Sequence, residues 1–421
     1  MIFFQSGIIF PAFISRNLGY IVLCFFIFHV QLSFAQESAW EKPYVGSNPD
    51  LLYYPDQNAV YYRYGWENNK QQGIVIKGKM PEARYFSFNL YNDYTKSSIL
   101  ALADYEIKPD ENDPLSFTIY IIPEGEPGKF QNSIILPDSV QVASVFLRYY
   151  LPKGNIYANR PLPTIKLLEN GALMPAIPSI PQAPMAPADI AKLKGVVTAN
   201  PKMISGKERK LLASSSASIQ EKEPVISKIF TVPIFRHYTD PTAIGAYNFN
   251  SGGNYPNKDN HYIVMPVVRK KDDVLVVRFK APSHGTQLGD TTKNVRYFSL
   301  SQGNEYTNTS ITLFDEQLKV SNDGFVYVVV ANDKSEIRSK VNEMGINFMP
   351  WLYKDKLVLI LRHMLPAPPF KLSTREVPVF INSRPAKGQE AELAIGEYAL
   401  IGKFFKKSAW KSVEGFQQFG F

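Results

Sequence analysis

The sequence predicts an all-β protein built from two homologous sandwich units, because two motifs recur along a chain that is rich in strand signals. The stretch Arg84–Ile99 returns as Arg296–Ile311, with nine of sixteen positions identical and no gap. Leu147–Pro152 returns as Leu361–Pro366, and the arginines of the two motifs are 64 residues apart in one copy and 66 in the other. We therefore expect an internal duplication of a unit well over one hundred residues long.

Runs of β-branched and aromatic residues, separated by Gly, Pro, Asn and Asp, predict the strands. Residues 36–60 lack such runs and are expected to form a loop-rich lead-in. The first set of predicted strands is Ala59–Gly65, Gly73–Gly78, Ala83–Asn89, Leu115–Ile122 and Val142–Leu151. The second set is Tyr262–Val268, Val274–Phe279, Val295–Ser301, Phe325–Val330 and Lys356–Met364.

Helical periodicity is scarce, and only short helices are expected. One is Asp189–Leu193, and another is Lys334–Met344, in which Ser335 is a candidate cap for the first turn. A third short helix is expected within Gly388–Leu400.

The first 35 residues have the build of a secretory signal. Arg16 precedes the apolar run Leu18–Val30, and Ser33 and Ala35 form a small-residue cleavage site. An uncleaved membrane anchor is the alternative, although the run is short for a span of roughly 20 residues. The one cysteine of the sequence, Cys24, lies in this segment, so the mature chain is expected to be exported to the periplasm or the extracellular space without disulfides.

The predicted organisation is a signal peptide at 1–35, a first β unit at 36–172, a linker at 173–225, a second β unit at 226–385 and a tail at 386–421. The linker begins with prolines at every third position, which suits a polyproline II helix: Pro175, Pro178, Pro181, Pro184 and Pro187. This segment is interpreted as a semi-rigid spacer or a strap on the protein's own aromatic surface. The alternative is a ligand for an aromatic-lined groove.

The tail interleaves basic and aromatic residues. Its aromatic residues are Phe404, Phe405 and Trp410, and its basic residues are Lys403, Lys406, Lys407 and Lys411. One interpretation is an anchor for an anionic membrane surface. The other is a terminal segment that packs its aromatic rings on the core and leaves its lysines in water.

The composition and the motifs of the sequence argue against several classes of function. The net charge of +8 is spread along the chain, so no nucleic-acid binding is expected. The histidines lack metal-type spacing, and neither a GxSxG elbow nor a Gly-rich phosphate loop occurs, so we expect no cofactor and no metal site. Carboxylate-pair hydrolases leave no local signature, and that class stays open.

The matched arginines are the first candidate site residues. Period-two alternation places each of them on an apolar strand face: Arg84, Arg148, Arg296 and Arg362. A buried arginine needs a carboxylate or carbonyl partner, and the matched acids are Asp93 with Glu305 and Asp104 with Asp315. We predict that Arg148 or Arg362, or both, is buried and bonded to a matched acid or to loop carbonyls. Such an arginine acts either as a staple of the fold or as an anchor for a carboxylate or sugar ligand.

The turns after the first motif strand supply the remaining candidates. Asn92-Asp93-Tyr94-Thr95 matches Asn304-Glu305-Tyr306-Thr307, and both follow a strand directly. Asn and Asp favour such turns because they bond to nearby backbone. Tyr94 and Tyr306 then either plug the sandwich edge or line the polar mouth of a binding site.

The segment Arg84–Asn92, the stretch Asn132–Pro137 and the strand Leu147–Pro152 resemble a bacterial β domain of unknown function. That domain forms the C-terminal half of some envelope-associated two-domain proteins. The resemblance covers residues 60–165 best, and the second copy departs from it because Gly303 replaces Tyr91. It implies a jelly-roll-like sandwich, with no agreed activity and no catalytic residues.

These observations favour an exported cell-envelope binding or structural protein that uses loops at the sandwich ends. Its expected ligand is an unidentified small molecule or a glycan. One alternative is a hydrolase of envelope or extracellular polymers, with carboxylates at the cleft between the units. Another is a peripheral membrane protein anchored by the tail.

Overall fold

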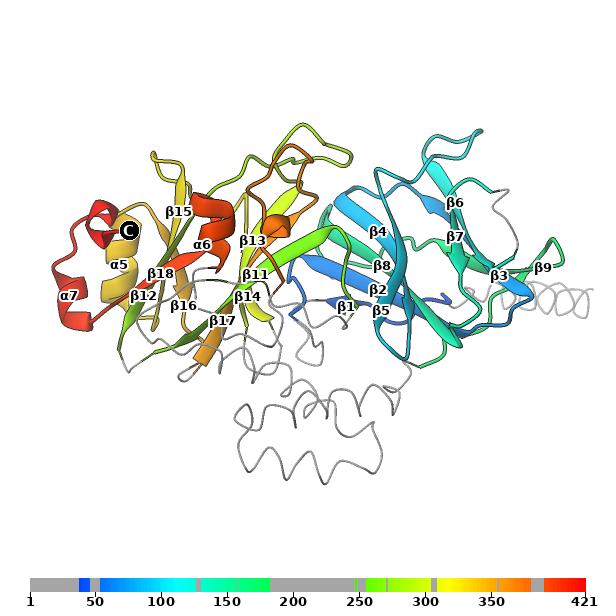
Figure 1. Cartoon of the computed structure of the whole chain (residues 1–421), viewed down its shortest axis with the longest axis horizontal. Helices are drawn as coiled ribbons and strands as arrows, with labels where there is room; N and C mark the ends of the chain where they lie inside the picture. Colours follow the sequence, from blue (N-terminus) through cyan, green and yellow to red (C-terminus); the bar gives the residue numbers. More distant parts are fainter. Residues whose placement is uncertain are drawn as a thin grey trace, which may run out of the picture. The chain divides into compact units, whose positions relative to one another are not determined.

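The computed structural model describes residues 38–45, 54–125, 130–156, 158–181, 246, 248, 255–269, 272–303, 309–353, 356–379 and 390–421. The chain divides into two compact units, Met1–Ala39 and Trp40–Phe421, and every element below belongs to the second. We call the described residues 40–181 the first half and the described residues from 246 onward the second half. Both halves are built mainly of strands (Figure 1).

Among its described residues, the first half contains two five-stranded sheets. Their strand orders are β1-β2-β8-β4-β5 and β10-β9-β3-β6-β7. The strands are β1 (Tyr44–Val45), β2 (Ala59–Glu67), β3 (Gln72–Lys79), β4 (Ala83–Asn92), β5 (Ser97–Ala103), β6 (Ser116–Pro123), β7 (Ser133–Leu136), β8 (Val142–Pro152), β9 (Thr164–Glu169) and β10 (Ala172–Pro175).

The second half, in the ranges described, contains two four-stranded sheets with the orders β11-β17-β13-β14 and β16-β15-β12-β18. Its strands are β11 (Asn260–Val268), β12 (Val274–Lys280), β13 (Tyr297–Gly303), β14 (Thr309–Phe314), β15 (Phe325–Ala331), β16 (Asn347–Pro350), β17 (Lys356–Met364) and β18 (Ile401–Phe405). Its helices are α5 (Ser335–Glu343), η2 (Thr374–Glu376), α6 (Glu390–Ile395), η3 (Gly396–Tyr398), α7 (Lys407–Lys411) and η4 (Phe416–Phe419).

The two halves have the same order of central strands. The order β2-β8-β4-β5 parallels β11-β17-β13-β14, and β9-β3-β6-β7 parallels β18-β12-β15-β16. Each half also has one parallel pair at the same place, β6 with β7 and β15 with β16. This parallel pair departs from the antiparallel sheets of a jelly roll. The halves differ in their connections, since α5 lies between β15 and β16 and α6 between β17 and β18.

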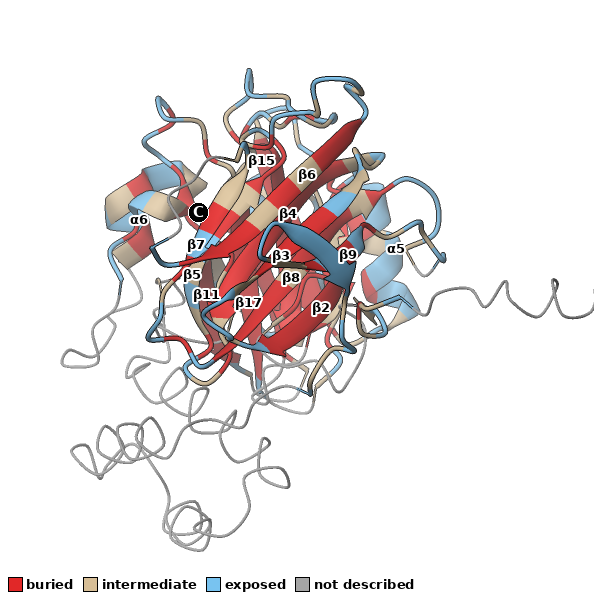
Figure 2. Ribbon diagram, turned by 90° about the vertical axis from the view of Figure 1, so that its right-hand side faces the viewer, coloured by how far each residue is buried: buried red, intermediate tan, exposed pale blue. Residues whose placement is uncertain are grey.

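Strand β4 is buried on both of its faces (Figure 2). Phe86 and Phe88 point to the opposing sheet, where their ring centroids lie 5.7 and 5.5 Å from that of Phe117 in β6. Tyr85, on the other face, packs at 5.7 Å against Tyr150 of β8. A strand covered on both faces loses the alternation of apolar and polar residues, which explains the continuous apolar character of this segment.

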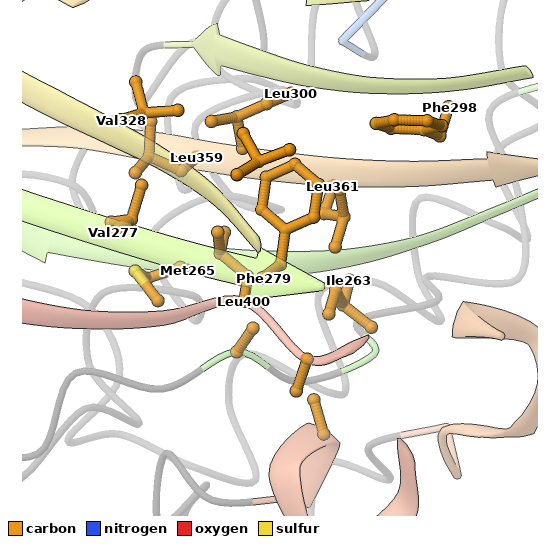
Figure 3. Packing of buried hydrophobic residues seen from close by; sticks show 14 of the residues in the cluster. Ile263, Met265, Val277, Phe279, Phe298, Leu300, Val328, Leu359, Leu361 and Leu400 are labelled. Atoms are coloured by element: carbon orange, nitrogen blue, oxygen red, sulfur yellow. The ribbon is translucent and has the colours of Figure 1, made fainter. Parts of the chain in front are cut away.

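The core of the second half lies between its two sheets. Figure 3 shows the Phe279 ring of β12 among aliphatic side chains of the facing sheet, including Leu300 and Leu361. Strand β18 and the segment before it close this core through the buried Leu400 and the partly buried Phe404. The chain after residue 400 is therefore part of the second half.

The ten strands predicted from the sequence are all present, with ends that shift by a few residues. The predicted helix Lys334–Met344 is present as α5, but Lys334 occupies the N-cap position and Ser335 is the first helical residue, so the predicted Ser335 cap is wrong. Within Gly388–Leu400 the helix is α6. The predicted helix Asp189–Leu193 lies outside the described residues.

The segment assigned to a basic aromatic tail contains strand β18, which pairs with β12. Its short sequence with an internal lysine and glycine gave no strand signal. The adjacent strand β12 supplies the backbone partners that make it a strand.

We predict that Phe279→Ala lowers the free energy of unfolding by about 3–5 kcal/mol, because it leaves a cavity between two packed sheets. Leu393→Ala is the matched control, since Leu393 is 84% exposed on α6 and its loss is expected to cost under about 0.5 kcal/mol. Equilibrium denaturant unfolding measures both values. Equal losses for the two variants would contradict the packing described.

Candidate functional site

Arg84 of the first half reaches into the second half. Its Nη1 lies 2.6 Å from Asp315 Oδ1, and its Nη2 lies 2.6 Å from Glu316 Oε1. Both Arg84 and Asp315 are buried, and the Phe298 backbone N–H donates to the second Asp315 oxygen at 3.1 Å. The charge of the guanidinium is therefore neutralised by carboxylates of the other half.

Arg296, which matches Arg84 in the sequence, makes the reverse contact. Its Nη1 lies 2.8 Å from Asp104 Oδ2 in the first half, and both groups are buried. The same nitrogen donates to the Arg84 carbonyl at 3.2 Å, and Nε donates to the Asp290 carbonyl at 2.9 Å. Each half thus supplies an arginine to the matched aspartate of the other.

Two matched tyrosines make a second reciprocal contact. Tyr85 OH donates to Asp259 Oδ2 and Tyr297 OH donates to Asp56 Oδ2, each at 2.8 Å. Burial raises the pKa of Tyr85 and of Tyr297 well above the ordinary value, so both hydroxyls stay protonated as donors.

Arg148 and Arg362 bond to backbone carbonyls across the same interface. Arg148 is 6% exposed, and its Nη2 donates to the Tyr255 carbonyl of the second half at 2.6 Å. Arg362 is 3% exposed, and it donates to the Tyr54 carbonyl of the first half and to Ser301 Oγ. The prediction that at least one of these arginines is buried and bonded to loop carbonyls is confirmed for both.

The carbonyls that receive these arginines come from a third repeated motif that sequence comparison missed. Residues 54–58 read Tyr-Pro-Asp-Gln-Asn, and residues 255–259 read Tyr-Pro-Asn-Lys-Asp. Tyr54 and Tyr255 both adopt positive φ, 52° and 53°, which is uncommon for a tyrosine and points to a required backbone direction. The shared Tyr-Pro pair was the signal available in the sequence.

An apolar cluster joins the two halves beside these polar contacts. The buried members are Ala59, Tyr61, Tyr85, Ala103, Tyr150, Tyr297 and Met364. The Tyr150 and Tyr297 rings, one from each half, lie 5.7 Å apart. We call this cluster, together with the reciprocal arginine and tyrosine contacts, the inter-half interface.

Asp93 is fully buried and receives donors from three directions. Its Oδ2 lies 3.0 Å from Arg63 Nη2, and its Oδ1 accepts from Ser144 Oγ at 2.7 Å and from Tyr255 OH at 2.8 Å. Asp93 therefore ties the first half to the second through Tyr255. The matched Glu305 lies outside the described residues.

The loop at Tyr94 is a turn held by its own asparagine. The Tyr94 and Thr95 backbone N–H groups donate to Asn92 Oδ1 at 3.0 and 3.3 Å. The turn predicted from Asn92 and Asp93 is therefore confirmed. Tyr306 lies outside the described residues, so of the two candidate tyrosines the structure describes only Tyr94.

Three interface aspartates have raised pKa values: Asp104, Asp259 and Asp315. Burial, which disfavours the charged carboxylate, is the largest cause for each. Arg296 and Arg84 oppose this shift at Asp104 and Asp315, and the Tyr85 hydrogen bond opposes it at Asp259. Carboxyl groups with raised pKa values suit acid–base chemistry. Each of these three, however, already accepts a hydrogen bond from an arginine or a tyrosine of the interface.

The tail packs its aromatic rings inside the second half. Trp410 and Phe419 are buried in a cluster with residues of β12, β15 and α5. Lys406 pairs with Asp273 at 2.8 Å and Lys407 with Glu336 at 3.6 Å. This arrangement matches the packing interpretation of the tail.

The described residues show neither a cluster of metal ligands nor a membrane-spanning helix. In the ranges that the structure describes, no three His, Cys, Asp or Glu side chains gather as metal ligands. None of the described helices is long and apolar enough to span a bilayer.

We predict that Asp104→Leu destabilises the protein by about 3–5 kcal/mol, because it leaves the buried Arg296 charge without its carboxylate. The double variant Asp104→Leu/Arg296→Met removes both charges and is expected to cost less than the single Asp104→Leu change. A double-mutant cycle of unfolding free energies measures the coupling. Additive losses would show that the two groups do not interact.

The buried His363 and the partly buried His261 predict a loss of stability in acid. His363 accepts a hydrogen bond from the Thr374 N–H at Nδ1, and burial lowers the pKa of His363 to about 3 and that of His261 to about 4. The unfolded chain therefore binds more protons than the folded chain below pH 6.5. As the pH is lowered, the free energy of unfolding decreases by about 1.4 kcal/mol per pH unit for each histidine that stays neutral in the folded state. The aspartates with raised pKa values have the opposite effect on stability, because the folded state binds their protons at a higher pH than the unfolded state does.

His363→Asn keeps an acceptor for Thr374 but removes the titrating group. We expect the slope of unfolding free energy against pH, measured between pH 6.5 and about 4, to decrease by about 1.4 kcal/mol per unit. An unchanged slope would mean that His363 is protonated in the folded state.

Comparisons with known proteins support the fold. No family model matches the chain, and no curated protein matches it significantly. An uncharacterised protein of known structure from Burkholderia cenocepacia aligns with 89% of this chain and 83% of its own, with a TM-score of 0.51 and 11% identity. A Vibrio parahaemolyticus protein aligns with 90% of this chain and 95% of its own, with a TM-score of 0.44 and 13% identity. The first of these shows that the all-β fold occurs in an uncharacterised bacterial protein.

Proposed function

We propose that the chain is an exported protein of the cell envelope with a binding or structural role, in which the two halves act as one body. The observation that supports the halves acting as one body is the reciprocal use of the matched arginines. Arg84, Arg148, Arg296 and Arg362 all donate across the inter-half interface. Side chains that resemble ligand anchors in the sequence are thus engaged in holding the protein together.

An internal duplication explains this interface. Three matched motifs, the common strand order and the exchange of equivalent contacts support a common origin for the halves. Identical units that meet across a twofold axis make the same contact twice, once in each direction. The proposed ancestor is a single jelly-roll-like unit with a parallel edge pair that associated with a second copy of itself.

The proposed ligand-binding region is the set of loops that follow the matched strands. Loops on a rigid β scaffold are the usual carriers of binding residues. Tyr94 and Tyr306 occupy equivalent loop positions in the sequence and are the candidate contacts for a small molecule or glycan.

Export is proposed from the leader-like segment 1–35. The sequence after it contains no cysteine, as expected of a protein that folds without disulfides. Mass spectrometry of the protein purified from its native cells is expected to find an N-terminus at Gln36. A cytoplasmic protein that retains Met1 would overturn this part of the proposal.

A hydrolase is the second candidate, because Asp104 and Asp259 have raised pKa values. An acid of this kind can donate a proton to a leaving group. The buried position and existing hydrogen bonds of both carboxylates make a binding role the stronger proposal.

The mature chain, residues 36–421, is to be tested for binding on glycan and metabolite arrays. We expect one ligand class to bind, and Tyr94→Ala or Tyr306→Ala to weaken binding at least tenfold, while Leu393→Ala leaves it unchanged. Turnover of an envelope polymer that Asp259→Asn abolishes, in a variant that still folds, would favour the hydrolase instead.

A further inference from the structure

The described end of the Pro-rich segment, Ile177–Pro181, lies along β2 beyond Val60 and Tyr61, the residues that pair with β1. The Ile180 N–H donates to the Gly65 carbonyl at 3.0 Å, and the Gly65 N–H donates to Ser179 Oγ at 2.8 Å. Tyr64 OH donates to the Ile177 carbonyl at 3.3 Å. The segment is thus held beside β2 through one backbone–backbone hydrogen bond, the Ile177 carbonyl and the Ser179 hydroxyl.

Arg63 is the charged centre of this contact. It is 1% exposed, and its Nη1 donates to the Ile180 carbonyl at 2.7 Å. Asp93 and Glu41 fix the guanidinium, and Ser179 Oγ donates to Glu41 Oε1 at 2.9 Å. A side chain at Gly65 would collide with the guanidinium, so the glycine makes room for it. A buried arginine that carboxylates hold in place, and that donates to a peptide carbonyl, is suited to peptide recognition.

The equivalent positions in strand β11 of the second half lack the donors of Arg63 and Gly65. In the same strand register, Val264 stands in place of Arg63 and Pro266 in place of Gly65. Val264 has no polar group, and Pro266 has no backbone N–H to donate. The arginine and glycine are therefore not required by the strand order that the halves share. Arg63 neutralises the buried Asp93, and its second nitrogen, Nη1, is left to bond to the Ile180 carbonyl.

Hydrogen bonds, more than apolar contacts, hold the bound segment. Ile177, Pro178 and Pro181 are exposed, so little apolar surface is buried in the contact. Prolines at every third position lie along one edge of a polyproline II helix and leave the intervening residues free to form hydrogen bonds. Such a segment loses little conformational entropy on binding, and another segment of the same kind can replace it.

We propose that Glu41, Arg63, Tyr64 and Gly65 form a binding site for extended, proline-containing peptides of a partner protein. The chain's own Ile177–Pro181 occupies the site in this structure, and a partner segment with the pattern Ile-Pro-Ser-Ile displaces it. This inference goes beyond the proposed function and does not depend on export or on a glycan ligand.

The test uses the full chain and a fluorescently labelled peptide with the sequence of Met174–Pro181. In the variant Ser179→Ala/Ile180→Pro the chain's own segment loses the hydroxyl and the N–H that bond to Glu41 and Gly65. Fluorescence anisotropy is expected to show at least tenfold tighter peptide binding to this variant than to the wild-type chain, because the site is vacated. The changed residues are partly exposed, so the variant is expected to fold, which circular dichroism checks.

Two controls identify the site. A peptide that carries the same two substitutions is expected to bind at least tenfold more weakly than the natural sequence. Adding Tyr64→Phe, which removes only the hydroxyl, to the vacated chain is expected to weaken binding severalfold without unfolding it. Equal affinity of the wild-type and vacated chains, or of the two peptides, would overturn the proposal.

Discussion

The cost of burying a charge governs this structure. Arg84, Arg296, Asp104 and Asp315 are all buried, and each arginine finds its carboxylate in the other half of the chain. Separation of the halves would either leave these charges unpaired or require water to reach all of them. Removal of one partner from a buried pair costs several kcal/mol, whereas the intact pair contributes little net stability. The pairs therefore specify which surfaces meet more than they add to stability.

This constraint changes where function is to be sought. Residues that match between the halves, such as Arg148 with Arg362, serve the inter-half interface. Positions at which the halves differ point to demands particular to one half, and Arg63 with Gly65 against Val264 with Pro266 is the clearest case. Divergence between matched positions thus separates structural demands from those particular to one half. Tyr94 lies in an ordinary turn, so its loop position is the one reason to propose it as a ligand contact.

Much of the fold could be predicted from local patterns. Strand β17 has the predicted bounds, Lys356–Met364, and contains the apolar run Leu357–Leu361. Strand β18 could not be predicted, because its five residues become a strand only through pairing with β12. The burial of Arg148 and Arg362 was predictable from their apolar neighbours. Their carbonyl partners at Tyr255 and Tyr54 were not, since these lie 107 and 308 residues away in the chain.

The sequence alone determined the β character, the repeated motifs and the need for partners at the matched arginines, because these follow from side-chain period and from the cost of unpaired charge. Tertiary structure decided which half supplies each partner: Asp315 serves Arg84 and Asp104 serves Arg296. No local pattern distinguishes a carboxylate of the same half from its counterpart in the other half. The distinction arises only when two surfaces meet, since the geometry of the interface sets which charges come within bonding distance.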